Sequence, residues 1–242
     1  MKTRSLSLVI VSATLLSCAV IGFVATLGTA LLWHAAAGNR VYAVANPYRH
    51  NYADSPVGPA AATSPLSGVF TGEVLYWTPL IETWAVLYQV DPNLIATLIQ
   101  IESCGDPSVS SPAGAQGLFQ VMPFHFSAGE DMLDVVTNAR RGMEYLVGGL
   151  ELAGGHAGLA LAGYNGGHGV INRGWATWAA ETQRYYSWGS RIYMEAASGM
   201  ATSPTLDEWL AAGGDRLCAQ ARQTQAQLEA ASRAQVMVIP GN

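Results

Sequence analysis

A single carboxylate, Glu102, lies near the end of a predicted apolar helix and is the first candidate for chemistry. It follows Ile95, Leu98 and Ile99 by seven, four and three residues, so it shares their face of the helix. A carboxyl group among aliphatic chains is disfavoured as an anion, so its pKa should rise. A glutamic acid that is protonated near neutral pH can protonate the leaving oxygen of a glycosidic bond. The alternative is a helix-end carboxylate that only accepts hydrogen bonds.

Three further segments carry polar groups suited to holding a sugar. Residues 114–120 form a glycine-containing loop that ends in Gln120, and residues 164–167 place a phenol and an amide where a glycine can take the left-handed helix cap. Tyr185 supplies a second phenol. Each segment alone is equally consistent with a packing aromatic or a turn amide. Together with one carboxylate, they favour an enzyme that acts on a glycan.

Four motifs, in this order along the chain, resemble the catalytic domain of the soluble lytic transglycosylase family, which has a lysozyme-like helical fold. They are 102–103 (ES), 117–123 (GLFQVMP), 163–166 (GYNG) and 181–185 (ETQRY). The resemblance covers residues 91–193, under half of the chain. The family usually has Met in place of Phe119 and Ala in place of Gly163, and both departures leave the polar groups intact. Cys104 directly after the first motif is less usual.

The resemblance implies that Glu102 is the sole catalytic acid and base. It implies six substrate-binding or positioning residues, which are Ser103, Gln120, Met122, Tyr164, Asn165 and Tyr185. The family cleaves the β-1,4 bond between N-acetylmuramic acid and N-acetylglucosamine in peptidoglycan and closes a 1,6-anhydro ring on the muramic acid. Peptidoglycan strands of the bacterial cell wall are therefore the expected partner of a monomeric enzyme.

The other acids offer no obvious second catalytic carboxylate. Asp106 follows the predicted end of the helix, Glu130 and Asp131 lie in a polar loop, and Glu181 is interpreted as a helix-start or structural carboxylate. Most glycoside hydrolases need two carboxylates, whereas attack by the sugar's own hydroxyl needs one acid that then acts as base. The pattern favours transglycosylation. A lysozyme-type muramidase and a non-catalytic peptidoglycan-binding module remain the alternatives.

Composition and motif content exclude other classes of function. Charged residues make up 12% of the chain, the net charge is -5, and the twelve Lys and Arg are scattered, so nucleic acid is not an expected partner. The five histidines show no metal-ligand spacing such as H-E-x-x-H, and no P-loop is present. The sequence predicts no metal and no cofactor.

Residues 1–33 are predicted to form a short cytoplasmic tip and a transmembrane helix. Lys2 and Arg4 precede 28 residues without charge, which at helical rise would span roughly 42 Å and exceed a hydrocarbon core of about 30 Å. The basic residues keep the N-terminus in the cytoplasm and place the rest of the chain outside, in the envelope. A signal cleaved near residues 43–45, which would release a secreted protein, and a lipoprotein signal at Cys18 are the alternatives.

Residues 34–67 are rich in Ala, Pro and Ser and indicate a linker. The catalytic domain is predicted over 68–200 and a C-terminal helical extension over 201–242. Helical periodicity spans 71–88, 138–153 and 159–164, and the helix of Glu102 begins after the Asp91-Pro92 pair. A last helix begins at Pro204. The fold class is therefore mainly α, with room for a short hairpin at 110–120 and a solvated tail at 219–234.

Cys104 and Cys218 are the only cysteines beyond the predicted membrane span. Outside the cytoplasm thiols can pair, so a Cys104–Cys218 disulfide is one hypothesis. Two separate buried thiols are the other, because spacing in sequence does not fix the distance between two Cα atoms.

Overall fold

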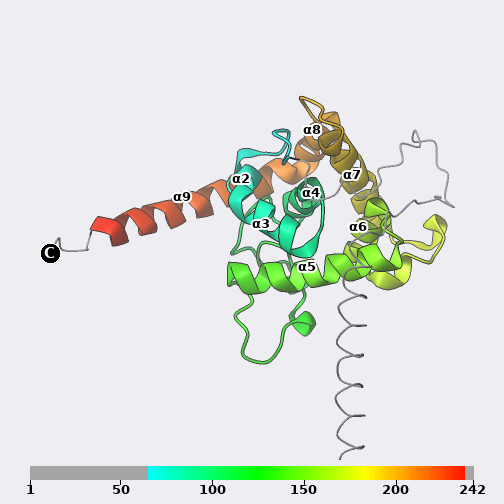
Figure 1. The fold of residues 1–242 in the computed structure, drawn as a ribbon, viewed down its shortest axis with the longest axis horizontal. Coiled ribbons are helices and arrows are strands. Elements are labelled where there is room, and N and C mark those ends of the chain that lie inside the picture. The colour runs from blue at the N-terminus through cyan, green and yellow to red at the C-terminus, as the bar shows by residue number, and fades with distance from the viewer. Residues whose placement is uncertain (1–64, 238–242) are drawn as a thin grey trace, which may run out of the picture. The chain divides into compact units, whose positions relative to one another are not determined.

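The computed structural model describes residues 65–237, and these fold into helices joined by short loops (Figure 1). No β-strand occurs in this range; the only extended pairings are two isolated bridges, Ser110–Gln116 and Gln116–Val121. The prediction of a mainly α domain is confirmed, and the bridges occupy the segment where a hairpin was expected. The predicted membrane anchor at 1–33 and most of the linker at 34–67 lie outside the described residues. Within residues 65–237, no helix combines the length and apolar character that crossing a membrane requires.

Eight α-helices follow one another through the described part of the chain. They are α2 (Gly72–Leu75), α3 (Thr78–Tyr88), α4 (Pro92–Glu102), α5 (Val135–Leu152), α6 (Ala157–Gly166), α7 (Ala180–Ala197), α8 (Pro204–Trp209) and α9 (Asp215–Met237). Four short helical turns lie between them, namely η1 (Pro123–His125), η2 (His168–Val170), η3 (Trp175–Thr177) and η4 (Leu210–Gly214).

Helix α4, which ends in Glu102, is the centre of the fold. Its first nine residues are all buried, and Figure 1 shows it enclosed by the surrounding helices. The helix begins where the Asp91 carboxylate accepts a hydrogen bond from the backbone N–H of Asn93 at 2.8 Å, and Pro92 occupies its first turn. Most residues of α4 are apolar, and its buried polar side chains Asn93, Thr97 and Gln100 make hydrogen bonds, so the helix is stable when it is covered on every side. The first nine residues of α4 therefore lie in the core, and its last residue, Glu102, carries a polar group at the C-terminal end.

The C-terminal helices share the core of the predicted catalytic domain. Leu206, Trp209, Cys218 and Ala221 are buried in the same hydrophobic cluster as α4. The predicted domain boundary at residue 200 thus does not separate two cores. Beyond Gln225 the described side chains of α9 are exposed, and this part of the helix extends away from the other helices in Figure 1.

Candidate active site

Glu102 is the last residue of α4, and its carboxyl group meets α7. The Tyr185 hydroxyl donates a hydrogen bond to Glu102 Oε1 at 2.6 Å. Burial raises the pKa of Glu102 to about 8; the Tyr185 hydrogen bond opposes the rise, and the negative charge of Glu181 adds to it. At neutral pH the group is therefore mainly a carboxylic acid that can give up a proton.

Tyr164 and Asn165 end α6 and connect it to two neighbouring elements. The Tyr164 hydroxyl donates to the backbone carbonyl of Phe119 at 2.8 Å, and Asn165 Oδ1 accepts a hydrogen bond from the Thr182 hydroxyl at 2.9 Å. Burial, together with the charge of Glu102, raises the pKa of Tyr164 well above its usual value. Tyr164 is therefore neutral at physiological pH and lies close enough to Glu102 to feel its charge.

Hydrogen bonds from the side chains of Gln120 and Asn138 to the backbone fix the conformation of the loop that carries Gln120. Gln120 has a positive φ of 46°, and its Nε2 donates to the carbonyls of Val109 and Gly117, both at 2.9 Å. The buried Asn138 side chain accepts a hydrogen bond from the backbone N–H of Phe119 at 2.8 Å. The amide nitrogen of Gln120 therefore braces its own loop. Asn138 was not singled out in the sequence, where it is only the first residue of a predicted helix.

Ser103, for which a positioning or substrate-binding role was predicted, lies inside the protein directly after Glu102. Its side chain is completely buried; the hydroxyl donates to the carbonyl of Leu118 at 2.7 Å and accepts from the N–H of Gly105 at 3.1 Å. It has no exposed surface with which to contact a substrate. Its hydrogen bonds instead fix the loop of Gln120 against the end of α4.

A pocket of about 130 Å³ opens beside these groups. Its lining consists of Gln120, Val121, Met122, Phe124, His125, Tyr145, Tyr164, Asn165 and Gly167. Four of the predicted substrate-binding residues thus surround one cavity. Glu102 and Tyr185 do not line it, whereas Tyr164 does, and the charge of Glu102 contributes to the raised pKa of Tyr164. Three other aromatic residues of the lining, Phe124, His125 and Tyr145, were missed in the sequence because nothing in their spacing separates them from core residues.

Comparison with known proteins identifies the central part of the chain. Residues 79–186 match the family model described as Transglycosylase SLT domain. This part of the chain is therefore similar to the Transglycosylase SLT domain family. The match contains all four motifs and every predicted site residue except Cys218.

Relatives of the chain are known from a phage and from bacteria. The chain is 35% identical over 117 residues to "Transglycosylase" of Enterobacteria phage PRD1, which covers 46% of this chain and 40% of that protein. It is 35% identical over 75 residues to an endo-type membrane-bound lytic murein transglycosylase A of Klebsiella pneumoniae subsp. pneumoniae, covering 31% of this chain and 33% of that one. The chain therefore spans less than half the length of these curated relatives.

Solved structures also resemble the fold. The 70 kDa soluble lytic transglycosylase from Escherichia coli aligns with a TM-score of 0.45 and 24% identity, over 54% of this chain and 25% of that one. The complex of a 70 kDa soluble lytic transglycosylase with bulgecin A aligns with a TM-score of 0.43 and 23% identity, over 52% and 26% of the two chains.

Three other acids were considered in the sequence as a second carboxylate, and two of them have partners elsewhere. Glu130 is bound by Arg140 and Arg141, and the hydrogen bond from Arg141 is the largest cause that lowers its pKa to about 2. Asp106 is buried and accepts hydrogen bonds from Ser108 and from two α9 residues. Glu181 is exposed in the first turn of α7, and its charge acts on Glu102. Of these acids, only Glu181 contributes to the electrostatics of the candidate acid.

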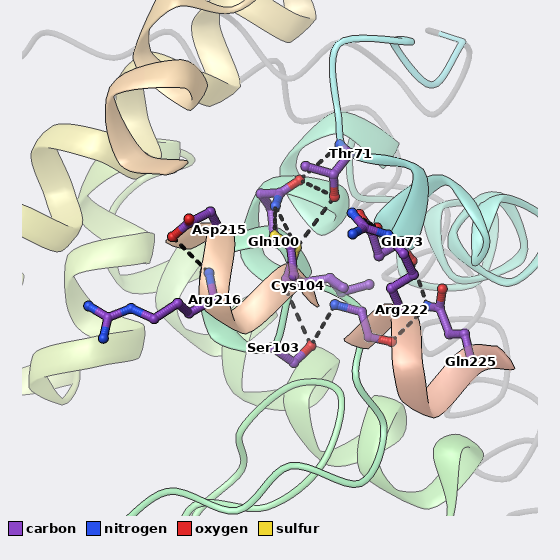
Figure 2. Close-up of a disulfide and its surroundings, with 12 residues drawn as sticks. Thr71, Glu73, Gln100, Ser103, Cys104, Asp215, Arg216, Arg222 and Gln225 are labelled. Carbon is purple, nitrogen blue, oxygen red and sulfur yellow. Dashed lines mark hydrogen bonds and ion pairs between the residues drawn. A yellow bond between two sulfur atoms is a disulfide. The ribbon is translucent and has the colours of Figure 1, made fainter. Parts of the chain in front are cut away.

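Helix α9 is fastened to the chain immediately after Glu102, although it lies outside the matched segment (Figure 2). Cys104 and Cys218 form a disulfide with their Cα atoms 4.9 Å apart, the first of the two alternatives for this pair. Gln225 Nε2 donates to the carbonyls of Gly105 at 3.0 Å and Glu73 at 2.8 Å. Cys104 and Gly105 both have positive φ, so the chain leaves α4 through a left-handed turn that α9 holds in place.

One cluster near the disulfide has the composition of a metal site. Ligand atoms of Glu73, Cys104 and Cys218 lie within 4.8 Å of one another, the only such cluster in the part of the chain that the structure describes. Metals bind the thiolate form of cysteine, and the disulfide consumes both thiols. Glu73 also forms an ion pair with Arg222. These groups therefore do not fit a metal ion.

Proposed function

We propose that the protein is a peptidoglycan lytic transglycosylase in which Glu102 is the only catalytic carboxylate. The observation that carries the proposal is a half-buried carboxyl group with a pKa near 8, hydrogen-bonded by Tyr185 and linked through Tyr164 to an open pocket. A carboxyl group with this pKa is protonated at neutral pH and can donate its proton to the leaving oxygen in the first step.

The reaction proceeds in two proton transfers. Glu102 gives its proton to the oxygen between N-acetylmuramic acid and N-acetylglucosamine, the bond from C1 to that oxygen breaks, and N-acetylglucosamine leaves with a free 4-hydroxyl. The carboxylate then removes the proton from the C6 hydroxyl of the muramic acid while that oxygen bonds to C1. The product is a 1,6-anhydro ring, and no water is consumed. Because the Tyr185 hydroxyl donates to Glu102, it stabilises the carboxylate between the two transfers.

The pocket residues are proposed to hold the glycan. Gln120, Met122, Tyr164 and Asn165 all line the cavity, so a sugar bound there contacts both a thioether and polar groups. Ser103 acts through the loop that it holds. A lysozyme-type hydrolase is the second candidate, because the charge of Glu181 reaches Glu102 and a second carboxylate could activate water.

The catalytic domain is proposed to work outside the cytoplasm. The charge-free run at 6–33 and the basic residues before it favour a membrane anchor with a cytoplasmic N-terminus, and signal cleavage with secretion is the alternative. Residues 34–67 would serve as the linker between the anchor and a monomeric enzyme. The disulfide supports this placement, because such bonds persist in oxidising compartments.

Digestion of purified peptidoglycan by the intact chain tests the activity. Soluble muropeptides that end in 1,6-anhydro-muramic acid, measured by mass spectrometry, are the expected products. Reducing ends, one water heavier, would show a hydrolase instead, and binding without any product would show a non-catalytic module. Glu102→Gln should lower the rate about 100-fold or more. The matched control is Glu151→Gln, which changes an exposed carboxylate on α5 and should leave the rate unchanged.

A further inference from the structure

The turn that follows Glu102, residues 103–106, is buried along its whole length, whereas most turns lie on the surface. Within it Cys104 has a φ of 48° and Gly105 a φ of 88°, and a residue with a side chain is strained at positive φ. A Cβ at Gly105 would also collide with the carbonyl oxygen of Glu73, so the turn is packed closely against that segment. Because Glu102 is the last residue of α4, the conformation of this turn affects where its carboxyl group lies.

Helix α9 supports the turn through four of its side chains. They are Cys218, Gln220, Thr224 and Gln225. Gln225 is 7% exposed, and its Nε2 donates to the carbonyls of Gly105 at 3.0 Å and Glu73 at 2.8 Å. The Asp106 carboxylate accepts the hydrogen bonds of the other two polar side chains, at 3.1 and 3.2 Å. Each of the three residues after Ser103 therefore has a partner on α9.

The disulfide also contacts α4 itself, on the other side of Glu102 in the sequence (Figure 2). Gln100 lies two residues before Glu102 and is completely buried. Its Nε2 donates to Cys104 Sγ at 3.0 Å and to Cys218 Sγ at 3.6 Å. The last turn of α4 is thus linked to α9 both before and after Glu102.

We propose that Gln225, together with the Cys104–Cys218 disulfide, positions Glu102 for reaction by holding the turn after α4, so that the catalytic unit of this chain includes α9. The proposal rests on the proposed function. It adds a helix that lies beyond the matched residues 79–186. Among the described residues, the titratable groups coupled to Glu102 are Tyr185 and Glu181 of α7 and Tyr164 of α6. Helix α9 therefore acts through the position of the carboxyl group and not through a charge of its own.

The test replaces Gln225 in the intact chain and measures the kinetics of its reaction on soluble, uncross-linked peptidoglycan strands. Gln225→Leu keeps the approximate size of the side chain and removes both hydrogen bonds. The kcat for release of anhydro-muropeptides should fall about 10-fold or more, because a small misplacement of a catalytic group has a large effect on rate. KM should stay unchanged, since no residue that lines the pocket belongs to α9.

A pH–rate profile of the same variant separates positioning from a general loss of stability. A carboxyl group that is held less firmly is more hydrated, so the pKa of Glu102 should fall from about 8 toward its ordinary value. The alkaline limit of activity should therefore move to lower pH. A variant in which only part of the protein is folded would lose rate equally at every pH and keep the wild-type limit.

A matched control and a second variant complete the experiment. Gln227→Leu makes the same change at an exposed position of α9 and should match wild type in kcat, KM and pH profile. Replacing Cys104 and Cys218 together by alanine should repeat the effect of Gln225→Leu.

Each other result counts against a stated claim. If both variants keep the wild-type kcat and alkaline limit, even with lower stability, α9 supports the fold alone and the positioning role is refuted. A rise in KM with kcat unchanged also refutes it, because α9 would then act on binding. If the wild-type chain releases no products from the strands, the proposed function itself fails, and the positioning role fails with it.

Discussion

Replacing the candidate acid should make the protein more stable, and by an amount that depends on pH. Glu102→Gln keeps the size of the side chain and an oxygen that can accept the hydrogen bond from Tyr185. It removes the only ionisable group at that position. Because the pKa of Glu102 is about 8 in the folded chain and about 4.5 in a model peptide, the fold binds this proton more tightly than the unfolded chain does.

The sign and size of the effect follow from that difference in pKa. Below pH 4.5 Glu102 is protonated in both states and contributes nothing to the pH dependence. As the pH rises from 4.5 to 8, the unfolded chain gains the free energy of ionisation and the folded chain does not, so wild-type stability falls. At 1.36 kcal/mol per pH unit, the loss at pH 7 is about 3.4 kcal/mol as an upper figure, and it levels off above pH 8. Glutamine does not ionise, so Glu102→Gln recovers this free energy.

Urea unfolding of both chains at pH 4, 7 and 8.5 measures the difference. All other groups titrate alike in the two proteins, so the difference in unfolding free energy isolates Glu102. We expect nearly equal stability at pH 4 and a variant more stable by about 2–3 kcal/mol at pH 7, with lost activity throughout. Glu151→Gln on the exposed side of α5 serves as the control and should show no such trend. A variant that is less stable than wild type by the same amount at every pH would refute the assignment of a buried, protonated acid.

Three further changes test the supports of the site. Tyr185→Phe removes the hydrogen bond that lowers the pKa of Glu102, so the alkaline limit of activity, set where Glu102 loses its proton near pH 8, should move upward, and a pH–rate profile shows the shift. Replacing both Cys104 and Cys218 by alanine should lower the unfolding free energy by about 2–4 kcal/mol, and reductant should then have no further effect on the urea midpoint. Gly142→Ala would place a Cβ 2.6 Å from the side chain of a buried phenylalanine, so it should cost about 1–3 kcal/mol in the same assay, whereas alanine at an exposed α5 position should not.

Local signals in the sequence were enough to place most helices. The Asp91-Pro92 pair marks the start of α4, and the periodic apolar residues of α5 and α6 predict both helices to within a few residues. Only the beginning of α7 was indicated, by Glu181 as a possible helix-start carboxylate, and the extent of the helix was not predicted. Its N-cap is Ala179, which has no side chain to cap the helix, and its buried face mixes Thr182, Tyr185 and glycine with aliphatic residues. The periodicity that identifies a helix by its apolar face is therefore weak in the helix that delivers Tyr185.

Site residues whose type suggests a chemical role could be predicted from the sequence. Residues that reach the site only through the packing of distant segments could not. Glu102 was found because an acid on an apolar face is unusual, and its raised pKa agrees with that reasoning. The resemblance left open whether Ser103 orients Glu102 or the substrate, and the structure buries its side chain, with its hydroxyl donating a hydrogen bond to the carbonyl of Leu118. The rings of His125 and Tyr145, about twenty positions apart in the sequence, lie with their centroids 4.5 Å apart, and no local pattern contains that information.

The position of Glu102 depends on residues that sequence similarity to the SLT domain does not reach. Glu102 is followed by a left-handed turn, and a non-glycine residue such as Cys104 adopts positive φ only where its surroundings enforce it. Here the disulfide to Cys218 and the hydrogen bond from Gln225 to Gly105 supply that constraint. Both come from α9, beyond the matched residues 79–186. The candidate acid is therefore held on one side by α7, through Tyr185, and the turn that follows it is held by α9, whose distal part, residues 219–234, was predicted to be a solvated tail.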